Sequence, residues 1–294
     1  MMNMIPADST QFLGLSAPDL QHADALVLPA PIEKTVSYGT GTAGGPRAIL
    51  EASYQLEPFD EETLVDFAES PRVHTLPPLD NRGDIETCLA RLRDYVRPLR
   101  DRFVLTLGGE HTITYGLVEG LIEDLSNVTV VQIDAHADLA DKLHGRHWSH
   151  GTVMRRLWER GCSLLQIGIR SLTRAEHDTA TTGPRITTFY AHSLKDQWAD
   201  LLDALIQLEG DVYLTIDVDG LDPAVIPSTG TPQPNGLSWG QMMDILRVLL
   251  TESRAGVLGA DVVEFVPSPV SPGCDPTAAR LAAKLLAWRS LGRR

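Results

Sequence analysis

The sequence contains six short apolar runs, most of which are near-continuous rather than alternating with polar residues. They lie at residues 25–30, 103–107, 128–133, 164–168, 212–216 and 257–263. Runs of this kind are typical of strands that are covered on both faces. Because helical patterns separate them along the chain, they predict one parallel sheet with helices on both sides.

The helical patterns are regular enough to be placed. Apolar residues recur three or four positions apart at 85–99 and 194–205, and Asp275 with Pro276 forms a cap and first-turn pair for a last helix that reaches about Trp288. No charge run, repeat or low-complexity linker interrupts the alternation. Residues 1–294 are therefore expected to form a single domain.

Charge and cysteine content restrict the partners and the compartment. Lys plus Arg is 25 and Asp plus Glu is 39, which gives a net charge of −14. This balance argues against nucleic acid and anionic membranes and favours a cationic ligand, although many cytosolic proteins are acidic. Three scattered cysteines without a C-x-x-C motif indicate a reducing cytoplasm. Neither a signal peptide nor a membrane span is expected, because no run of about 18 apolar residues exists.

Three of the apolar runs end in polar motifs. Residues 104–107 lead into Gly108-Gly109-Glu110-His111, residues 130–133 into Asp134-Ala135-His136-Ala137-Asp138, and residues 212–216 into Asp217-Val218-Asp219. Ligands of an open parallel sheet bind outside the carboxyl ends of its strands. Because extended geometry places residues i, i+2 and i+4 on one side, the acids and imidazoles of these motifs can converge.

Four clustered carboxylates need a compensating charge. Two unit charges about 4 Å apart repel by roughly 4 kcal/mol at a near-surface dielectric. Two divalent ions would cancel the four negative charges, and an oxygen-rich set with two imidazoles suits Mn²⁺ better than the thiolate-rich sites of structural zinc. Any one of the motifs alone could be a simple turn. All three, each after an apolar strand, indicate a two-metal site.

These motifs resemble a known family. LGGEHTIT, VVQIDAHAD and TIDVDGLDPAVIPS, with Gly236 after them, are similar to the three signatures of the ureohydrolases, which include arginases and agmatinases. The resemblance runs from about Tyr38 to Trp288, and VSYGTGTAGGPRAI, SHGTVMRR and GADVVEF look most like agmatinases. It implies an arginase-like three-layer α/β/α fold with a mainly parallel sheet of about eight strands, and a homo-oligomer, either a trimer or a hexamer.

The resemblance also implies a role for each residue. It gives His111, Asp134, Asp138 and Asp217 as ligands of one Mn²⁺, and His136, Asp134, Asp217 and Asp219 as ligands of the other. A hydroxide between the metals would attack the guanidinium carbon. Asp138, His150 and Glu264 are the implied catalytic residues: His150 would shuttle protons, and Glu264 would hold the guanidinium. Glu110 departs from the Asp of many members, at a position that is not a family ligand.

The expected reaction is hydrolysis of agmatine to putrescine and urea, in the course of polyamine biosynthesis. Arg146, in the loop KLHGRHWS, could instead bind a carboxylate, which keeps a guanidinobutyrase or guanidinopropionase open, and arginase is a further alternative. In the same loop His144 and His147 are expected to face solvent, and Trp148 either stacks on a cation or packs.

Two readings outside the hydrolases remain. One is a regulatory pseudoenzyme on the same fold, which the intact ligand positions, His150 and Glu264 argue against. The other is a dinucleotide-binding enzyme, because residues 39–44 match G-x-G-x-x-G. That motif should follow its strand directly, yet eight residues separate it from the run at 25–30. We therefore interpret it as a loop that enters a helix.

Overall fold

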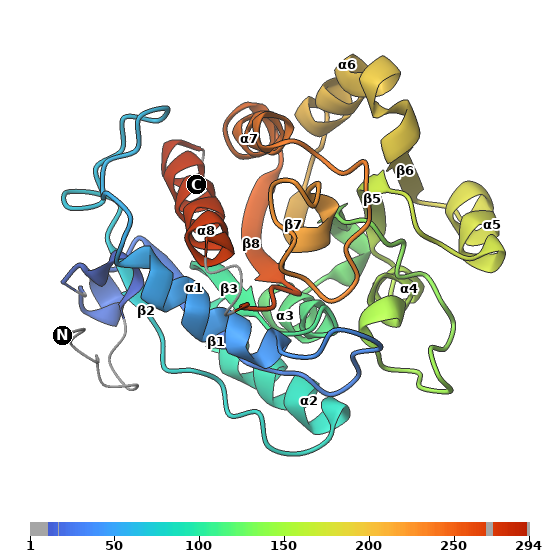
Figure 1. Cartoon of the computed structure of the whole chain (residues 1–294), viewed down its shortest axis with the longest axis horizontal. Helices are drawn as coiled ribbons and strands as arrows, with labels where there is room; N and C mark the ends of the chain where they lie inside the picture. The colour runs from blue at the N-terminus through green and yellow to red at the C-terminus, as the bar shows by residue number, and fades with distance from the viewer. Residues whose placement is uncertain (1–10, 17, 269–272, 293–294) are drawn as a thin grey trace.

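The computed structural model describes residues 11–16, 18–268 and 273–292, and within them it contains one sheet of eight parallel strands (Figure 1). The strands are β1 (Ala25–Ala30), β2 (Val73–Thr75), β3 (Phe103–Gly108), β4 (Val128–Ile133), β5 (Ser163–Ile169), β6 (Ile186–Tyr190), β7 (Asp211–Asp217) and β8 (Gly256–Val263). Their order across the sheet is β2-β1-β3-β8-β7-β4-β5-β6. The predicted parallel α/β architecture is confirmed.

Helices cover both faces of this sheet. One face carries α1 (Gly45–Ser53), α6 (Leu194–Ile206), α7 (Trp239–Arg247) and α8 (Cys274–Leu291), and the other carries α2 (Ile85–Val96), α3 (Ile113–Leu121), α4 (Val153–Glu159) and α5 (Arg174–Thr182). Successive strand residues alternate between the two layers: Leu26 packs in one core and Val27 in the other, and both are fully buried. Each such side chain contributes roughly 1.5–3 kcal/mol, which explains why most positions of the central strands are apolar.

Two strands were missed by the sequence pattern, and both lie at the edges of the sheet. β2 has only three residues, and β6 (ITTFY) is largely half-exposed. An edge strand has one neighbour and less cover, so its sequence lacks the continuous apolar run that identifies a central strand.

Two predicted helix boundaries were also wrong. The helix expected at 85–99 ends at Val96, because Pro98 lies in the short 3₁₀ turn Arg97–Leu99 that follows. The last helix begins at Cys274 with Gly273 at the cap position, so Asp275 and Pro276 lie inside its first turn rather than forming its cap pair. The error arose because Pro is tolerated anywhere in the first turn, where its missing N–H has no partner to lose.

The glycine-rich segment at 39–44 is a loop that enters α1, as expected. Gly39 has a φ of +64°, and a Cβ there would lie 2.5 Å from the Gly230 Cα. The absence of a side chain at Gly39 therefore permits close packing of this loop against the long loop at 221–238. None of the described helices is long and apolar enough to cross a membrane.

Candidate metal centre

Four neighbouring strands at the centre of the sheet supply the candidate site. In the order β3, β8, β7 and β4 they end in the segments that carry His111, Glu264, Asp217 with Asp219, and Asp134 with His136 and Asp138. Because all strands are parallel, their carboxyl ends meet at one edge. The structure brings the six predicted metal ligands to that edge. Five of them form two groups of side chains whose potential ligand atoms lie within 4.8 Å of one another, whereas Asp138 belongs to neither group and contacts His111.

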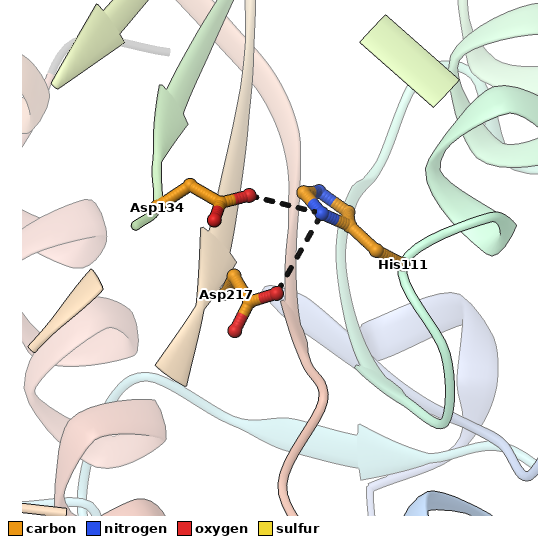
Figure 2. A group of neighbouring side chains, drawn as sticks. All are labelled: His111, Asp134 and Asp217. Atoms are coloured by element: carbon orange, nitrogen blue, oxygen red, sulfur yellow. Dashed lines mark ion pairs between the residues drawn. The ribbon is translucent and has the colours of Figure 1, made fainter. Parts of the chain in front are cut away.

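The inner group consists of His111, Asp134 and Asp217, and it is deeply buried. Figure 2 shows the two carboxylates, at the ends of β4 and β7, pointing toward the imidazole. The His111 Nδ1 atom lies 3.2 Å from Asp134 Oδ2 and 3.8 Å from Asp217 Oδ2, and Asp138 Oδ2 lies 2.9 Å from the same nitrogen. The side chain of His111 is only 1% exposed.

The outer group consists of Asp134, His136 and Asp219. His136 Nδ1 lies 3.0 Å from Asp219 Oδ2 and 3.6 Å from Asp134 Oδ1, and the His136 side chain is 24% exposed. Asp134 belongs to both groups and presents a different oxygen to each histidine. Asp134 is therefore the residue best placed to bridge two ions, whereas the bridging role predicted for Asp217 stays a prediction.

A buried hydrogen-bond chain orients His111. Its Nε2 lies 2.8 Å from Thr215 Oγ1, and the Thr215 hydroxyl donates to Asp261 Oδ1 at 2.6 Å. Because that hydroxyl hydrogen is committed to the carboxylate, Thr215 accepts from Nε2–H, and Nδ1 is directed at the carboxylates of Asp134 and Asp138. Tyr213 and Thr114 also donate to Asp261, each at 2.9 Å. Ligating histidines are oriented by such partners in metalloproteins.

Sequence reasoning missed Thr215 and Asp261, although a signal was present. Asp261 is an acid inside an otherwise apolar strand, and Thr215 lies two residues before Asp217, on the same side of its strand. The sheet register pairs the two directly across β7 and β8.

The burial of so many acids and imidazoles shifts the pKa values of the cluster. Burial, with the negative charges of its neighbours, raises the pKa of Asp217 well above its ordinary value, and burial raises the pKa of Asp138 to about 7. Burial opposes charge on His136, yet Asp134 and Asp219 raise its pKa to about 11. The cluster therefore retains protons when metal-free, and divalent ions would replace them.

His111 Nδ1 supports the same reading. This atom is buried and makes no hydrogen bond of acceptable geometry, although carboxylate oxygens surround it. Carboxylate oxygens that converge on an imidazole nitrogen are a donor set that fits a divalent metal ion once that nitrogen has lost its proton.

A cavity of about 790 Å³ opens above the cluster. Its lining includes ligands of both groups together with His150 and Glu264, the two remaining predicted site residues. Glu264 follows β8 with a φ of +61°, and its Oε1 accepts from the His111 backbone N–H at 2.6 Å. Burial raises the pKa of Glu264 to about 8. Asp138 also has a positive φ, +52°. Such backbone conformations in residues other than glycine are concentrated at functional sites.

The four side chains singled out from the sequence in the loop KLHGRHWS all lie outside the cavity lining. Arg146 is exposed, donates to the Lys34 carbonyl at 3.0 Å and is absent from the cavity lining. Trp148 is half-buried against Tyr115, with ring centroids 4.5 Å apart, so it packs. His144 and His147 are exposed, as expected, but His147 also contacts the buried Arg156 guanidinium, with Nη1 2.8 Å from its ring nitrogens.

Comparison with known proteins agrees with this arrangement. The model of the arginase family matches residues 23–290. An N(1)-aminopropylagmatine ureohydrolase from Synechocystis sp. is 36% identical over 97% of this chain and 96% of its own, and an agmatinase from Bacillus anthracis is 31% identical over 93% and 94%. The crystal structure of the agmatine ureohydrolase of Thermoplasma volcanium superposes with a TM-score of 0.82, at 26% identity over 96% and 94% of the two chains. The chain belongs to the arginase family of enzymes.

Proposed function

We propose that this protein hydrolyses a guanidino compound to urea and an amine with two Mn²⁺ ions, and that agmatine is a substrate. The observation that carries the proposal is the pair of ligand groups sharing Asp134 at the floor of a cavity that Glu264 and His150 also line. Two divalent ions held there would lower the pKa of bound water to a value useful near neutral pH.

The residues around the cluster have separate tasks. Glu264 is held by two backbone contacts, with its N–H donating to the Gly109 carbonyl and its Oε1 accepting from His111 N–H. A fixed, buried carboxylate is a good acceptor for the planar guanidinium, and binding the cation would keep it ionised. Burial lowers the pKa of His150, so this imidazole is neutral and able to accept a proton. The catalytic role of Asp138 remains a proposal of the same kind.

The lining of the cavity favours a cationic substrate over a guanidino acid. Beyond the metal cluster it includes the carboxylates of Asp141 and Glu176. Asp141 pairs with Arg156 at 3.3 Å, whereas the buried Glu176 accepts from the Thr173 hydroxyl. Lys142 and Arg155 also line the cavity, but Arg155 is paired with Glu159 at 2.8 Å. Arg146, the residue that the sequence offered as a partner for a substrate carboxylate, lies outside the lining.

N(1)-aminopropylagmatine is a second candidate substrate. The Synechocystis relative bears that name, and a volume of about 790 Å³ leaves room beyond the length of agmatine. Pockets that bind small molecules enclose most of the ligand surface, so a spacious cavity favours the longer cation.

A urea-release assay tests both candidates. The purified enzyme, loaded with Mn²⁺, is given agmatine, N(1)-aminopropylagmatine, arginine, 4-guanidinobutyrate and 3-guanidinopropionate, and kcat/KM is measured for each. We expect the two cationic amines to lead. A guanidino acid in first place would refute the substrate proposal, and release of no urea from any compound would refute guanidino hydrolysis and favour a regulatory protein. Light scattering tests the proposed trimer or hexamer, and cell fractionation the cytoplasmic location.

A further inference from the structure

Glu110 is a fully buried carboxylate beside the site that is not a candidate ligand. Its Oε2 accepts from the backbone N–H groups of Lys34 and Thr35, the latter at 2.6 Å. Its Oε1 accepts from the hydroxyls of Thr35 at 2.7 Å and Thr112 at 2.6 Å. All four donors are thus directed at one side chain, and Thr35 is attached to it twice.

Thr35 also contacts His150. The backbone N–H of His150 donates to Thr35 Oγ1 at 3.2 Å, and the ring nitrogen Nδ1 lies 3.5 Å from the same oxygen, at the outer limit of a hydrogen bond. Because the Thr35 hydroxyl hydrogen is committed to Glu110, its oxygen can only accept from His150. A contact with an obligatory acceptor favours the tautomer in which Nδ1 carries the hydrogen.

The other polar neighbours of the ring do not make this choice. Ser149 Oγ lies 3.2 Å from Nδ1, and Ser37 Oγ lies 3.2 Å from Nε2. Each of these hydroxyls can rotate to donate or accept. Ser37, the neighbour of Nε2, lines the cavity together with His150, so Nε2 is the nitrogen placed to accept a proton from a bound molecule.

We propose that Glu110, acting through the Thr35 hydroxyl, is a positioning residue that holds His150 with hydrogen on Nδ1 and leaves Nε2 as the proton acceptor facing the cavity. The kinetic consequence of this inference rests on the proposed function, whereas the tautomer itself does not. A histidine in the wrong tautomer is in place but cannot act as the base, which is why such orienting groups have large effects on turnover.

Glu110→Gln tests this series of hydrogen bonds with a side chain of nearly the same shape. The amide oxygen must accept from Lys34 N–H and Thr35 N–H, so the NH₂ group faces the two threonine hydroxyls. Thr35 then accepts from the amide and turns its own hydrogen toward His150 Nδ1, which favours the opposite tautomer. We expect kcat to fall about 10- to 100-fold with KM little changed, and metal content to stay at the wild-type level.

Threonine variants provide matched controls. Thr35 and Thr112 both donate to Glu110 Oε1, but of these two threonines it is Thr35 whose hydroxyl contacts His150. Thr35→Val should lower kcat as Glu110→Gln does, Thr35→Ser should restore it, and Thr112→Val should retain most of it. Equal losses in Thr35→Val and Thr112→Val would overturn the inference, as would a loss of activity in Glu110→Gln that follows a loss of metal, since Glu110 precedes His111.

The tautomer can be measured independently of activity. Neutral imidazole nitrogens with and without hydrogen differ in their ¹⁵N chemical shifts, and His150→Asn identifies the resonance in histidine-labelled enzyme loaded with diamagnetic Zn²⁺. We expect Nδ1–H in the wild type and Nε2–H in Glu110→Gln. An Nε2–H wild type would refute the inference even if the enzyme is active. An enzyme that releases no urea yet shows the expected tautomers would refute the proposed function and leave the inference standing.

Discussion

The inner and outer groups have the same composition, one histidine and two aspartates, but the protein surrounds them differently. His111 is 1% exposed and is oriented by Thr215 and Asp261. The His136 side chain is 24% exposed, and in the described part of the chain its ring has no polar partner beyond Asp134 and Asp219. The inner ion would therefore be held by a preorganised pocket, and the outer ion by a site that stays open to the cavity.

This difference suits two functions: tight binding of one ion in the inner group, and exchange of bound water for substrate at an ion in the outer group. A ligand whose orientation is fixed by buried neighbours binds its metal more tightly than one that is free to turn. An exposed ion can exchange its water for substrate. We therefore expect that an ion in the inner group would bind more tightly and that an ion in the outer group would be lost first.

The largest effect is expected from Asp134→Ala, because Asp134 belongs to both groups. This variant should retain neither ion after dialysis, and urea release should fall to background. Asp219→Ala is the matched variant and should lose only the outer ion. Metal content per subunit, measured by atomic emission, distinguishes the two. If Asp134→Ala kept one ion while Asp219→Ala kept none, the assignment of the shared ligand would be wrong.

Loss of the hydrogen bonds that orient His111 should weaken metal binding at the inner group alone. Thr215→Val removes the acceptor for Nε2–H, and Asp261→Asn weakens the carboxylate that commits the Thr215 hydroxyl; each should lower Mn²⁺ affinity by about 10- to 100-fold. Thr231, whose hydroxyl is 3.5 Å from Asp219 in the outer group, provides the control, and Thr231→Val should change affinity little. Calorimetric titration with Mn²⁺ measures both affinities. Equal losses of Mn²⁺ affinity in the three variants would contradict the proposed difference between the inner and outer groups.

Metal uptake should depend on pH in a predictable direction. In the metal-free protein, burial raises the pKa of Asp138 to about 7, so below that value this carboxylate is protonated and must release a proton before it binds an ion. Mn²⁺ affinity should therefore fall as pH is lowered, by about tenfold per pH unit for each proton displaced. The fall should be steeper below 7, where Asp138 holds a proton in addition to the one on His136. Titration at several pH values, with the released protons counted in weak buffer, provides the measurement. Affinity independent of pH between 5.5 and 8 would argue against this set of ligands.

The smallest effect is expected at Arg146, on the exposed loop above the cavity. Arg146→Ala should leave kcat/KM for agmatine within about twofold of the wild type, because exposed polar contacts contribute little. Glu264→Gln, which changes the proposed guanidinium acceptor, is the comparison and should have a much larger effect. If 4-guanidinobutyrate were hydrolysed and its kcat/KM collapsed in Arg146→Ala, the loop rather than the cavity wall would determine the substrate.

Much of this protein could be predicted from local patterns. The central strands were recognisable because burial on two faces favours apolar residues at most positions, as in β4, where only Thr129 and Gln132 are polar. The polar motifs were recognisable because they begin where these runs end, and parallel strands bring such ends together. The edge strand β6 was missed for the converse reason, since a half-exposed strand has no comparable constraint on its sequence.

The sequence by itself determined which residues reach the metal cluster, and the tertiary structure decided how each is supported. Thr215 and Asp261 are 46 residues apart, and Glu110 and Thr35 are 75 apart, so no local spacing relates either pair. Strand register places Thr215 opposite Asp261, and the loop after β1 brings Thr35 to Glu110 and His150. Burial, which differs between His111 and His136, likewise depends on elements that are distant in the chain. Motifs are local and can be read from spacing, whereas orientation, charge state and exposure arise from contacts that exist only after the chain has folded.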